Sequence, residues 1–165
     1  MWLDLREIIE VPGASVPFSA ELDPAILQTP SITGFHGPVT AEGSVSNTAG
    51  LLRLKAQVAA DMACLCDRCG APFDRRKRLE VDAALSADME DEDEATVFPL
   101  EGDGIDVSQV LETCFILETE SKLLCRDSCR GICPACGKNL NDGPCGCQPP
   151  KDPRFAVLGQ LLDIN

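Results

Sequence analysis

Eight of the ten cysteines fall into closely spaced groups, and this spacing is the feature of the chain that could support chemistry. Cys133 and Cys136 form a C-x2-C pair that is followed by Gly137. Two thiolates at this spacing can point into one tetrahedral metal site, and the glycine allows backbone N–H groups to reach the sulfur atoms. We therefore expect a zinc knuckle here, with Cys145 and Cys147 as its second pair of ligands.

A second C-x2-C pair, Cys66 and Cys69, lies far from the first along the chain. Its expected partners are Cys125 and Cys129, because two four-cysteine sites would then use all eight clustered thiols. A competing arrangement is a single zinc whose ligands are drawn from Cys129, Cys133, Cys136 and either Cys145 or Cys147. An iron–sulfur cluster could also use four cysteines. The sequence therefore predicts at least one zinc ion, and two if both sets of four assemble.

Disulfide bonds are the alternative use of many cysteines in a short chain. The chain begins with acids at Asp4 and Glu7, where a secretory signal peptide would carry lysines followed by an apolar stretch. Clustered C-x2-C thiols in a reducing compartment more often bind zinc than form disulfides. We therefore expect a cytoplasmic protein whose thiols hold metal. No run of about 18 apolar residues occurs, so we expect no membrane span.

Alternation of apolar and polar residues predicts a sheet that would position these cysteines. The longest alternating run, 52–66, ends at the first residue of the Cys66 pair, and 79–87 alternates in the same way. The turn-like composition of 67–72 predicts that these two runs form an antiparallel hairpin. Shorter alternating runs at 39–45 and 16–22 predict a third and a fourth strand. We expect a twisted antiparallel sheet with one face exposed to water.

Helical signals follow the predicted sheet. Asp106 and Gln109 resemble a capping box, and an apolar stripe at helical spacing follows them. A second helix is predicted to open at Asp152-Pro153, because proline is favoured at the first helical position. The two remaining cysteines, Cys64 and Cys114, lie on predicted apolar faces and are expected to pack in the core.

These elements predict an α+β fold: an antiparallel β-sheet with one or two packed helices and a cysteine-rich zinc-knuckle segment. Residues 1–121 would form the sheet and helix core, with an acidic loop at 88–95. Residues 122–165 would form the zinc-binding segment and the C-terminal helix. With 165 residues, of which 44% are hydrophobic, the chain is long enough to bury a core of this kind.

The charge of the chain is strongly uneven. The formal net charge is −13, from 14 Lys and Arg against 27 Asp and Glu. Between Glu80 and Glu120 there are 14 acids and no Lys or Arg, and the run 88–94 alone holds six acids. Such a run is either a solvated loop or a docking site for a basic protein. An overall charge of this sign argues against tight, nonspecific binding to nucleic-acid phosphates.

Nine of the 14 bases nevertheless lie beside cysteines. The candidate phosphate-contacting residues among them are Arg75, Arg76, Lys77, Arg78, Arg126 and Arg130. They could form a local nucleic-acid-binding face. Alternatively, they hydrate the surface or offset the negative charge of zinc thiolates, and we favour this second interpretation.

Catalytic signals are weak in this chain. The single histidine, His36, is remote from the cysteine groups and is expected at the surface or in a turn. Neither a G-x-S-x-G nucleophile motif nor a G-x4-G-K-[ST] phosphate loop occurs. A thioredoxin-type redox pair needs a strand-to-helix setting, whereas Cys66 and Cys69 are predicted between two strands. We therefore expect that the protein is not an enzyme.

The order of these motifs resembles the bacterial YceD family, the large ribosomal RNA subunit accumulation proteins, which also occur in plastids. The matching residues are the C-D-R-C motif at 66–69, Pro72-Phe73, the helix start at 105–107, the segment 124–141, Cys145-Gly146-Cys147 and Asp152-Pro153-Arg154. The resemblance covers most of the chain. It implies a role in the synthesis, processing or stability of large-subunit ribosomal RNA.

Together with the charge pattern, the resemblance leads us to expect a non-enzymatic zinc-binding factor in ribosome biogenesis. Ribosomal proteins are basic, so an acidic chain could bind one before assembly by charge complementarity. The expected partner is a ribosomal protein or an assembly intermediate of the large subunit, with only weak direct contact to rRNA. The alternatives are a zinc-dependent rRNA-binding module and a structural or redox-sensing zinc protein unrelated to ribosomes.

Overall fold

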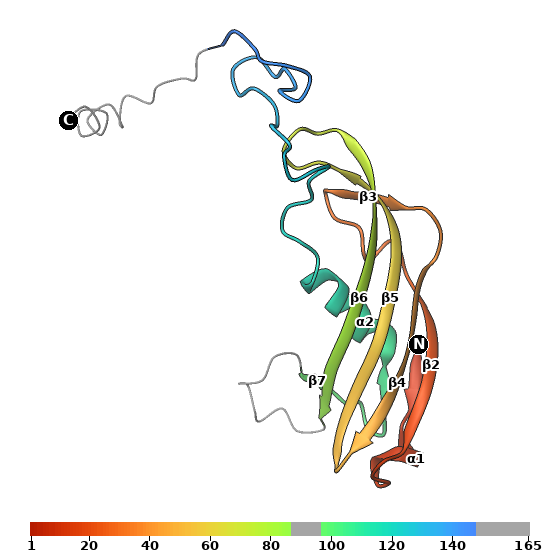
Figure 1. Ribbon diagram of the computed structural model, residues 1–165. Coiled ribbons are helices and arrows are strands. Elements are labelled where there is room, and N and C mark those ends of the chain that lie inside the picture. Colours follow the sequence, from red (N-terminus) through yellow and green to blue (C-terminus); the bar gives the residue numbers. More distant parts are fainter. Residues whose placement is uncertain (87–96, 148–165) are drawn as a thin grey trace, which may run out of the picture.

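The computed structural model describes residues 1–86 and 97–147, and its main element is a long, curved β-sheet (Figure 1). The strands of this sheet are β2 (Ser15–Leu22), β3 (Ile32–Phe35), β4 (Val39–Thr48), β5 (Leu51–Leu65), β6 (Pro72–Ser86) and β7 (Val97–Pro99). They follow the order β2-β4-β5-β6-β7, and β3 pairs with β5 off this path. The pairings are antiparallel except that of β6 with β7, so the sheet is mixed only at this edge.

A small second sheet and two helices complete the described fold. Their bounds are β1 (Trp2–Asp4), α1 (Arg6–Ile9), β8 (Gly104–Asp106) and α2 (Val107–Leu117), with β1 and β8 paired antiparallel. The fold is therefore α+β, as the sequence predicts. The helix predicted at Asp152-Pro153 and the acidic loop at 88–95 lie outside the described residues. No helix within the described ranges is long and apolar enough to cross a membrane.

The hairpin of β5 and β6 carries the first cysteine pair at its tip. The two strands pair in continuous antiparallel register along almost their whole length. β5 confirms the predicted strand at 52–66 as far as Leu65, and β6 confirms that at 79–87 as far as Ser86, the last described residue before the gap. However, β6 begins at Pro72, earlier than the alternation indicates. Arg75 and Lys77 occupy half-buried positions of β6, so charged residues interrupt the apolar pattern in this part of the strand. The predicted third and fourth strands are also present, as β4 and β2.

One face of the main sheet packs against α2 and forms the hydrophobic core (Figure 1). Leu54 and Met62 of β5 and Phe115 of α2 are at most 1% exposed. Burying this apolar surface stabilises the packing by about 25 cal/mol per Å² removed from water. Cys64 and Cys114 are buried in the same core, which confirms their predicted role in packing.

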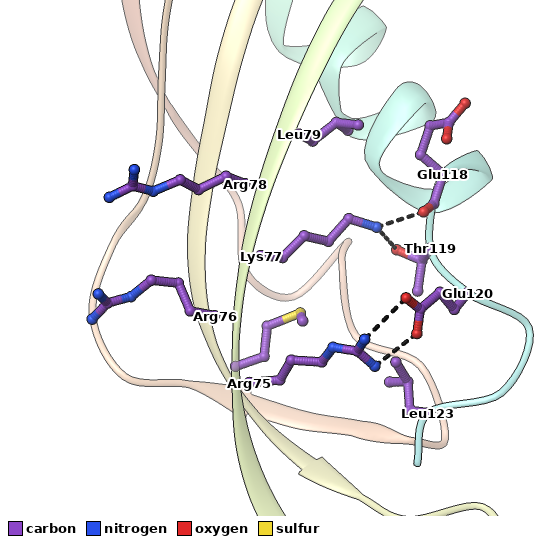
Figure 2. Close-up of a pocket in the computed structure, with 10 residues that line it drawn as sticks. Arg75, Arg76, Lys77, Arg78, Leu79, Glu118, Thr119, Glu120 and Leu123 are labelled. Carbon is purple, nitrogen blue, oxygen red and sulfur yellow. Dashed lines mark hydrogen bonds and ion pairs between the residues drawn. The ribbon is translucent and has the colours of Figure 1, made fainter. Parts of the chain in front are cut away.

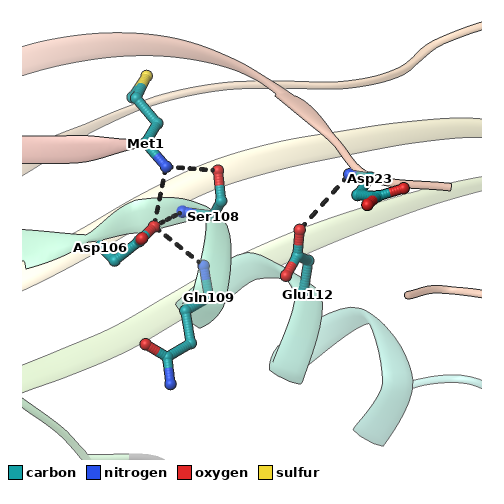
Figure 3. Close-up of polar contacts among 6 residues, drawn as sticks. All are labelled: Met1, Asp23, Asp106, Ser108, Gln109 and Glu112. Carbon is teal, nitrogen blue, oxygen red and sulfur yellow. Dashed lines mark hydrogen bonds and ion pairs between the residues drawn. The ribbon is translucent and has the colours of Figure 1, made fainter. Parts of the chain in front are cut away.

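The predicted cap of α2 is present, and the amino group of Met1 reinforces it. Asp106 Oδ1 accepts hydrogen bonds from the backbone N–H groups of Ser108 at 3.0 Å and of Gln109 at 3.3 Å. The ammonium group of Met1 donates to the same oxygen at 2.9 Å (Figure 3). A carboxylate at this position satisfies free N–H groups and balances the positive end of the helix dipole. It therefore ties the first residues of the chain to the start of α2.

Candidate metal centres

After α2, the chain returns along β6 toward the tip of the β5–β6 hairpin, and polar contacts hold it there (Figure 2). Arg75 and Glu120 form a bidentate ion pair, with N–O distances of 2.7 and 3.0 Å. Lys77 Nζ donates to the backbone oxygen of Glu118 at 2.6 Å and to Thr119 Oγ1 at 3.1 Å. These contacts bring the cysteine-rich segment that follows to the hairpin tip.

The first cluster consists of Cys66, Cys69, Cys125 and Cys129, whose sulfur atoms all lie within 4.8 Å of one another. The Sγ–Sγ distance is 3.8 Å both between Cys66 and Cys129 and between Cys69 and Cys125. Tetrahedral zinc with Zn–S bonds of about 2.3 Å places sulfur atoms about 3.8 Å apart, whereas a disulfide bond is about 2.05 Å long. The four thiols therefore fit a tetrahedral metal ion, and all ten cysteines are free.

The turn between β5 and β6 sets the positions of Cys66 and Cys69. The N–H of Gly70 donates to the backbone oxygen of Cys66 at 2.8 Å, and the N–H of Cys66 donates to the backbone oxygen of Ala71 at 2.9 Å. Gly70 has a φ of +70°, a left-handed conformation that glycine adopts without steric cost. The chain therefore reverses within a few residues, and both thiols reach one site.

The two residues between these cysteines bind the chain that carries the other two ligands. Asp67 Oδ2 accepts a hydrogen bond from the backbone N–H of Leu123 at 2.5 Å, and Oδ1 accepts one from the hydroxyl of Ser31. Arg68 Nη1 donates to the backbone oxygen of Cys129 at 2.7 Å. The first C-x2-C motif thus holds the second pair of thiols in place through its own central side chains.

The second cluster consists of Cys133, Cys136, Cys145 and Cys147, whose sulfur atoms also lie within 4.8 Å of one another. Its turn repeats the hydrogen bonds of the first turn. The N–H of Gly137 donates to the oxygen of Cys133 at 2.9 Å, and the N–H of Cys133 donates to the oxygen of Lys138 at 2.8 Å. Gly137 has a φ of +71°. The two C-x2-C-G turns are therefore the same local structure at two places in the chain.

The two clusters differ in their exposure to solvent. Cys66 and Cys129 of the first cluster are buried, and its other two cysteines are half-buried. In the second cluster Cys136 and Cys147 are exposed, and only Cys133 is buried. The first cluster therefore lies against the folded sheet, and the second lies at the surface.

The thiols within a cluster do not ionise equally. Burial opposes ionisation of Cys66, but backbone N–H groups outweigh it and lower the pKa of this thiol to about 6. Backbone N–H groups, that of Cys136 foremost, lower the pKa of Cys133 to about 6. Burial and neighbouring sulfurs raise the pKa of Cys125 to about 12, and the sulfur of Cys136 raises the pKa of Cys147 to about 12. A bound cation would favour ionisation of these remaining thiols.

The structure brings the eight predicted cysteines together as two sets of four. Cys129 belongs to the set at the hairpin tip, so it does not join Cys133 and Cys136 in the single site of the competing arrangement. The described residues therefore contain two clusters that could hold metal ions.

The predicted basic residues of β6 are divided between two faces, because successive residues of a strand point in opposite directions. Arg75 and Lys77 point toward the end of α2, whereas Arg76 and Arg78 point to the other side of the strand (Figure 2). Arg76 forms an ion pair with Asp61 at 2.6 Å. Arg78 has no ion pair or hydrogen bond with any described residue. These four side chains therefore do not share one face.

The other predicted polar residues lie outside the sulfur clusters. Arg126 and Arg130 are exposed in the cysteine-rich segment, on either side of Cys129. The side chain of His36 is 56% exposed, and its Nε2 lies 2.7 Å from Asp74 Oδ1, which confirms it as a surface residue. The role of the two arginines in binding nucleic acid stays a prediction.

Sequence reasoning misses three residues that support the first cluster. Two of them are Asp67 and Arg68, whose contacts are described above. The third is Asn141, whose Nδ2 donates to Cys129 Sγ at 3.4 Å. Only their positions in the sequence could have pointed to these roles: Asp67 and Arg68 lie between two ligand cysteines, and Asn141 follows a knuckle turn.

The fold and the site define a class: an α+β protein with two four-cysteine clusters that could hold metal ions. Residues 54–162 match the model of a family described as large ribosomal RNA subunit accumulation protein YceD. The chain belongs to this family, and the resemblance found in the sequence is confirmed.

Individual relatives are similar to this chain over part of their length. A chloroplastic protein of Arabidopsis thaliana, large ribosomal RNA subunit accumulation protein YCED homolog 1, is 36% identical over 67 residues, or 40% of this chain and 21% of that protein. Uncharacterized proteins of Mycobacterium bovis and Mycobacterium tuberculosis are 31% identical over 109 residues, or 64% of this chain and 53% of theirs. This chain thus spans about a fifth and about half of these relatives. No solved structure matches it.

Proposed function

We propose that this protein is a zinc-binding factor that supports the accumulation of large-subunit ribosomal RNA in the cytoplasm without catalysing a reaction. Family membership and the name of the Arabidopsis relative support the RNA part of the proposal. One observation carries the metal part: Asp67 and Arg68 hold sulfurs from two chain segments at the separation of a tetrahedral site.

Zinc is the metal that the ligand chemistry favours. Four cysteine thiolates are typical of structural zinc sites, and they leave no coordination position for water or substrate. This closed ligand set supports a non-catalytic role. In the segment 124–147, only Cys129, Gly131 and Cys133 are buried, so apolar packing contributes little to its shape. Metal binding would then supply much of the folding free energy of this segment.

We further propose that the partner is a basic ribosomal protein, alone or in an assembly intermediate of the large subunit. The 14 acids between Glu80 and Glu120 support this choice, because that stretch contains no Lys or Arg. Among the described residues, cations elsewhere in the chain pair only with Asp82, Asp106 and Glu120 of these acids. Of these acids, six are exposed in the described part of the chain: Glu80, Asp82, Glu101, Asp103, Glu118 and Glu120. Complementary charge would speed encounter with a basic partner and exclude other acidic proteins.

The partner is tested with two full-length variants of equal net charge. In one, the six acids of 88–94 become Asn or Gln. In the control, the changed residues are six other exposed acids that form no ion pair with any described residue: Glu7, Glu10, Glu21, Glu42, Asp127 and Asp142. We expect only the first variant to lose ribosomal proteins in a low-salt affinity purification. Equal recovery of ribosomal proteins by both variants would contradict the proposal.

The role in RNA accumulation is tested in cells that lack the gene. The unaltered protein should restore the ratio of large-subunit to small-subunit rRNA, whereas Cys66→Ser/Cys69→Ser should not. A Cys64→Ser variant is the matched control, because Cys64 is a buried thiol of the core outside both clusters. Restoration of the ratio by the double variant, once its first cluster is shown to hold no metal, would contradict metal dependence.

A zinc-dependent rRNA-binding module is the second candidate. Arg78 favours it, because this cation has no ion pair within the described residues and points away from α2 (Figure 2). If Arg78 contacts phosphates, Arg78→Glu should weaken binding to precursor rRNA fragments and make the salt dependence less steep. Arg76→Glu is a poor probe, since it also breaks the pair with Asp61. Binding unchanged by Arg78→Glu would argue against this candidate.

A further inference from the structure

A side chain from the segment that carries the second cluster reaches a sulfur atom of the first cluster. Asn141 follows the knuckle turn of the second cluster, yet its Nδ2 donates to the sulfur of Cys129, a member of the first cluster, at 3.4 Å. Its Oδ1 accepts a hydrogen bond from the backbone N–H of Arg130 at 2.8 Å. The same Nδ2 also donates to Asn139 Oδ1 at 2.8 Å. Asn141 is therefore held on both sides and aimed at a candidate ligand atom.

The hairpin that carries the second cluster is docked closely against the first. Within this hairpin, Leu140 donates its N–H to the oxygen of Gly131 at 2.8 Å, and Ile132 and Asn139 form a bridge just beyond, so Gly131 is fixed at its base. A Cβ atom on Gly131 would lie 2.9 Å from both Cγ and the backbone oxygen of Arg68, a distance that real side chains do not tolerate. The backbone at Gly131 thus lies directly on the first C-x2-C turn.

Apolar packing contributes little to the shape of this hairpin. Ile132 is 51% exposed, and Cys133 is its only buried side chain between residues 132 and 141. Four sulfurs on one cation would close the loop from 133 to 147 and fix the bridge at its base. With the second cluster empty, the residues that place Asn141 against Cys129 lose that constraint.

We propose that metal binding at the second cluster tightens metal binding at the first, and that Asn141 is the positioning residue that couples the two. The inference rests on the proposed function in one respect, that both clusters bind metal. A hydrogen-bond donor placed on a ligand sulfur stabilises the thiolate and orients it, and such outer contacts typically change metal affinity by about 10–100-fold. By linkage, metal at the first cluster tightens the second by the same factor.

The test is a cobalt titration of the full, reduced chain, because Co²⁺ on four thiolates absorbs strongly and the variants show which cluster is being filled. Cys133→Ser/Cys136→Ser disables the second cluster. We expect this change to weaken Co²⁺ binding at the first cluster by about tenfold, the lower end of the range for outer contacts. Asn141→Ala should weaken it by a similar factor with all eight cysteines present. Combining the two changes should add nothing further.

Two variants separate the coupling from a general structural effect. Asn141→Asp keeps the oxygen that accepts from Arg130 but loses the donor to sulfur and adds a negative charge beside it, so it should bind Co²⁺ at the first cluster at least as weakly as Asn141→Ala does. Asp142→Ala is the control, because this exposed neighbour places no side-chain contact on either cluster within the described residues. It should bind Co²⁺ as the unaltered chain does. Circular dichroism of each variant should show the same sheet.

The outcomes distinguish this inference from the proposed function. If neither cluster binds Co²⁺ or Zn²⁺, the proposed function fails. If both clusters bind but the first has the same affinity with and without Cys133 and Cys136, the coupling is overturned. If the Cys133→Ser/Cys136→Ser variant does not fold, two other titrations decide the coupling. Co²⁺ must fill the two clusters of the unaltered chain cooperatively, and it must fill those of Asn141→Ala independently of each other.

Discussion

At the scale of single residues, the side chains between and after the ligand cysteines determine how the first cluster assembles. Asp67 binds Leu123 and Arg68 binds the oxygen of Cys129, so together they hold both ends of the one segment that brings Cys125 and Cys129 from far along the sequence. The spacing of the cysteines is enough to predict both C-x2-C turns. It cannot predict these contacts, because their partners are more than fifty residues away and leave no local pattern.

Asp67→Ala removes no ligand, yet it should weaken metal binding at the first cluster by about 10–100-fold. The reason is that Leu123 loses its carboxylate acceptor, and Cys125 is then less well placed. A competition titration with a zinc chelator would measure the change. Asp74→Ala is the matched control, because Asp74 is exposed and pairs only with His36 among the described residues. Equal zinc affinity in the two variants would show that Asp67 does not preorganise the site.

Asp106→Ala should lower the free energy of unfolding by about 1 kcal/mol, because α2 loses its capping side chain. Gln109→Ala, one turn into the helix, should change it little. The Met1 ammonium and the helix N–H groups lower the pKa of Asp106 below its ordinary value of 3.8. Its stabilisation is therefore complete above pH about 4 and is lost as pH falls through the lowered pKa. Urea unfolding at neutral pH and at pH about 3 would show a difference between variant and parent that shrinks in acid.

At the scale of elements, β6 has two halves of different character: one packs on the hydrophobic core, and the other carries a run of charged residues. Its second half, from residue 79 onward, follows the apolar alternation of a strand packed on a core and is predicted correctly. Its first half carries Arg75 to Arg78 instead, and the strand is missed there. Beyond its pairing with β5, β6 pairs only at residues 84–86 with β7 in the described fold. Charged side chains on such an open edge discourage pairing with other chains, which gives these bases a structural role.

Very short elements also escape prediction from sequence. The strands β1, β7 and β8 each have three residues, too few for a periodic pattern to show. The helix α2 is predicted because it has both a cap and a stripe of apolar residues. The alternation of apolar and polar residues therefore predicts long buried segments, but it does not predict short strands whose pairing depends on distant partners.

Arg75→Ala should speed hydrogen exchange of the backbone N–H groups in 118–123 and leave the β5–β6 hairpin protected. The Arg75–Glu120 pair holds this segment to β6, and its side chains are partly exposed, so little global stability should be lost. Arg76→Ala is the control, since its ion pair with Asp61 lies on the other face of the strand. Equal exchange in both variants would mean that the pair does not hold the segment.

At the scale of the whole molecule, two different forces stabilise two parts of one chain. The sheet and α2 share a core of apolar side chains, whereas the cysteine-rich segment has almost none. A strong chelator should therefore abolish protection from hydrogen exchange in 125–147 while β4, β5 and β6 remain protected. Re-addition of zinc should restore the lost protection. Simultaneous unfolding of the sheet at the same chelator concentration would contradict this division.

The central claim is that the two cysteine clusters hold metal, and native mass spectrometry of the purified full chain tests it most directly. The account predicts two zinc ions per chain, with one lost in Cys66→Ser/Cys69→Ser and the other lost in Cys133→Ser/Cys136→Ser. A chain that carries no stoichiometric metal, and whose mass shows disulfide bonds formed within the clusters, would contradict it.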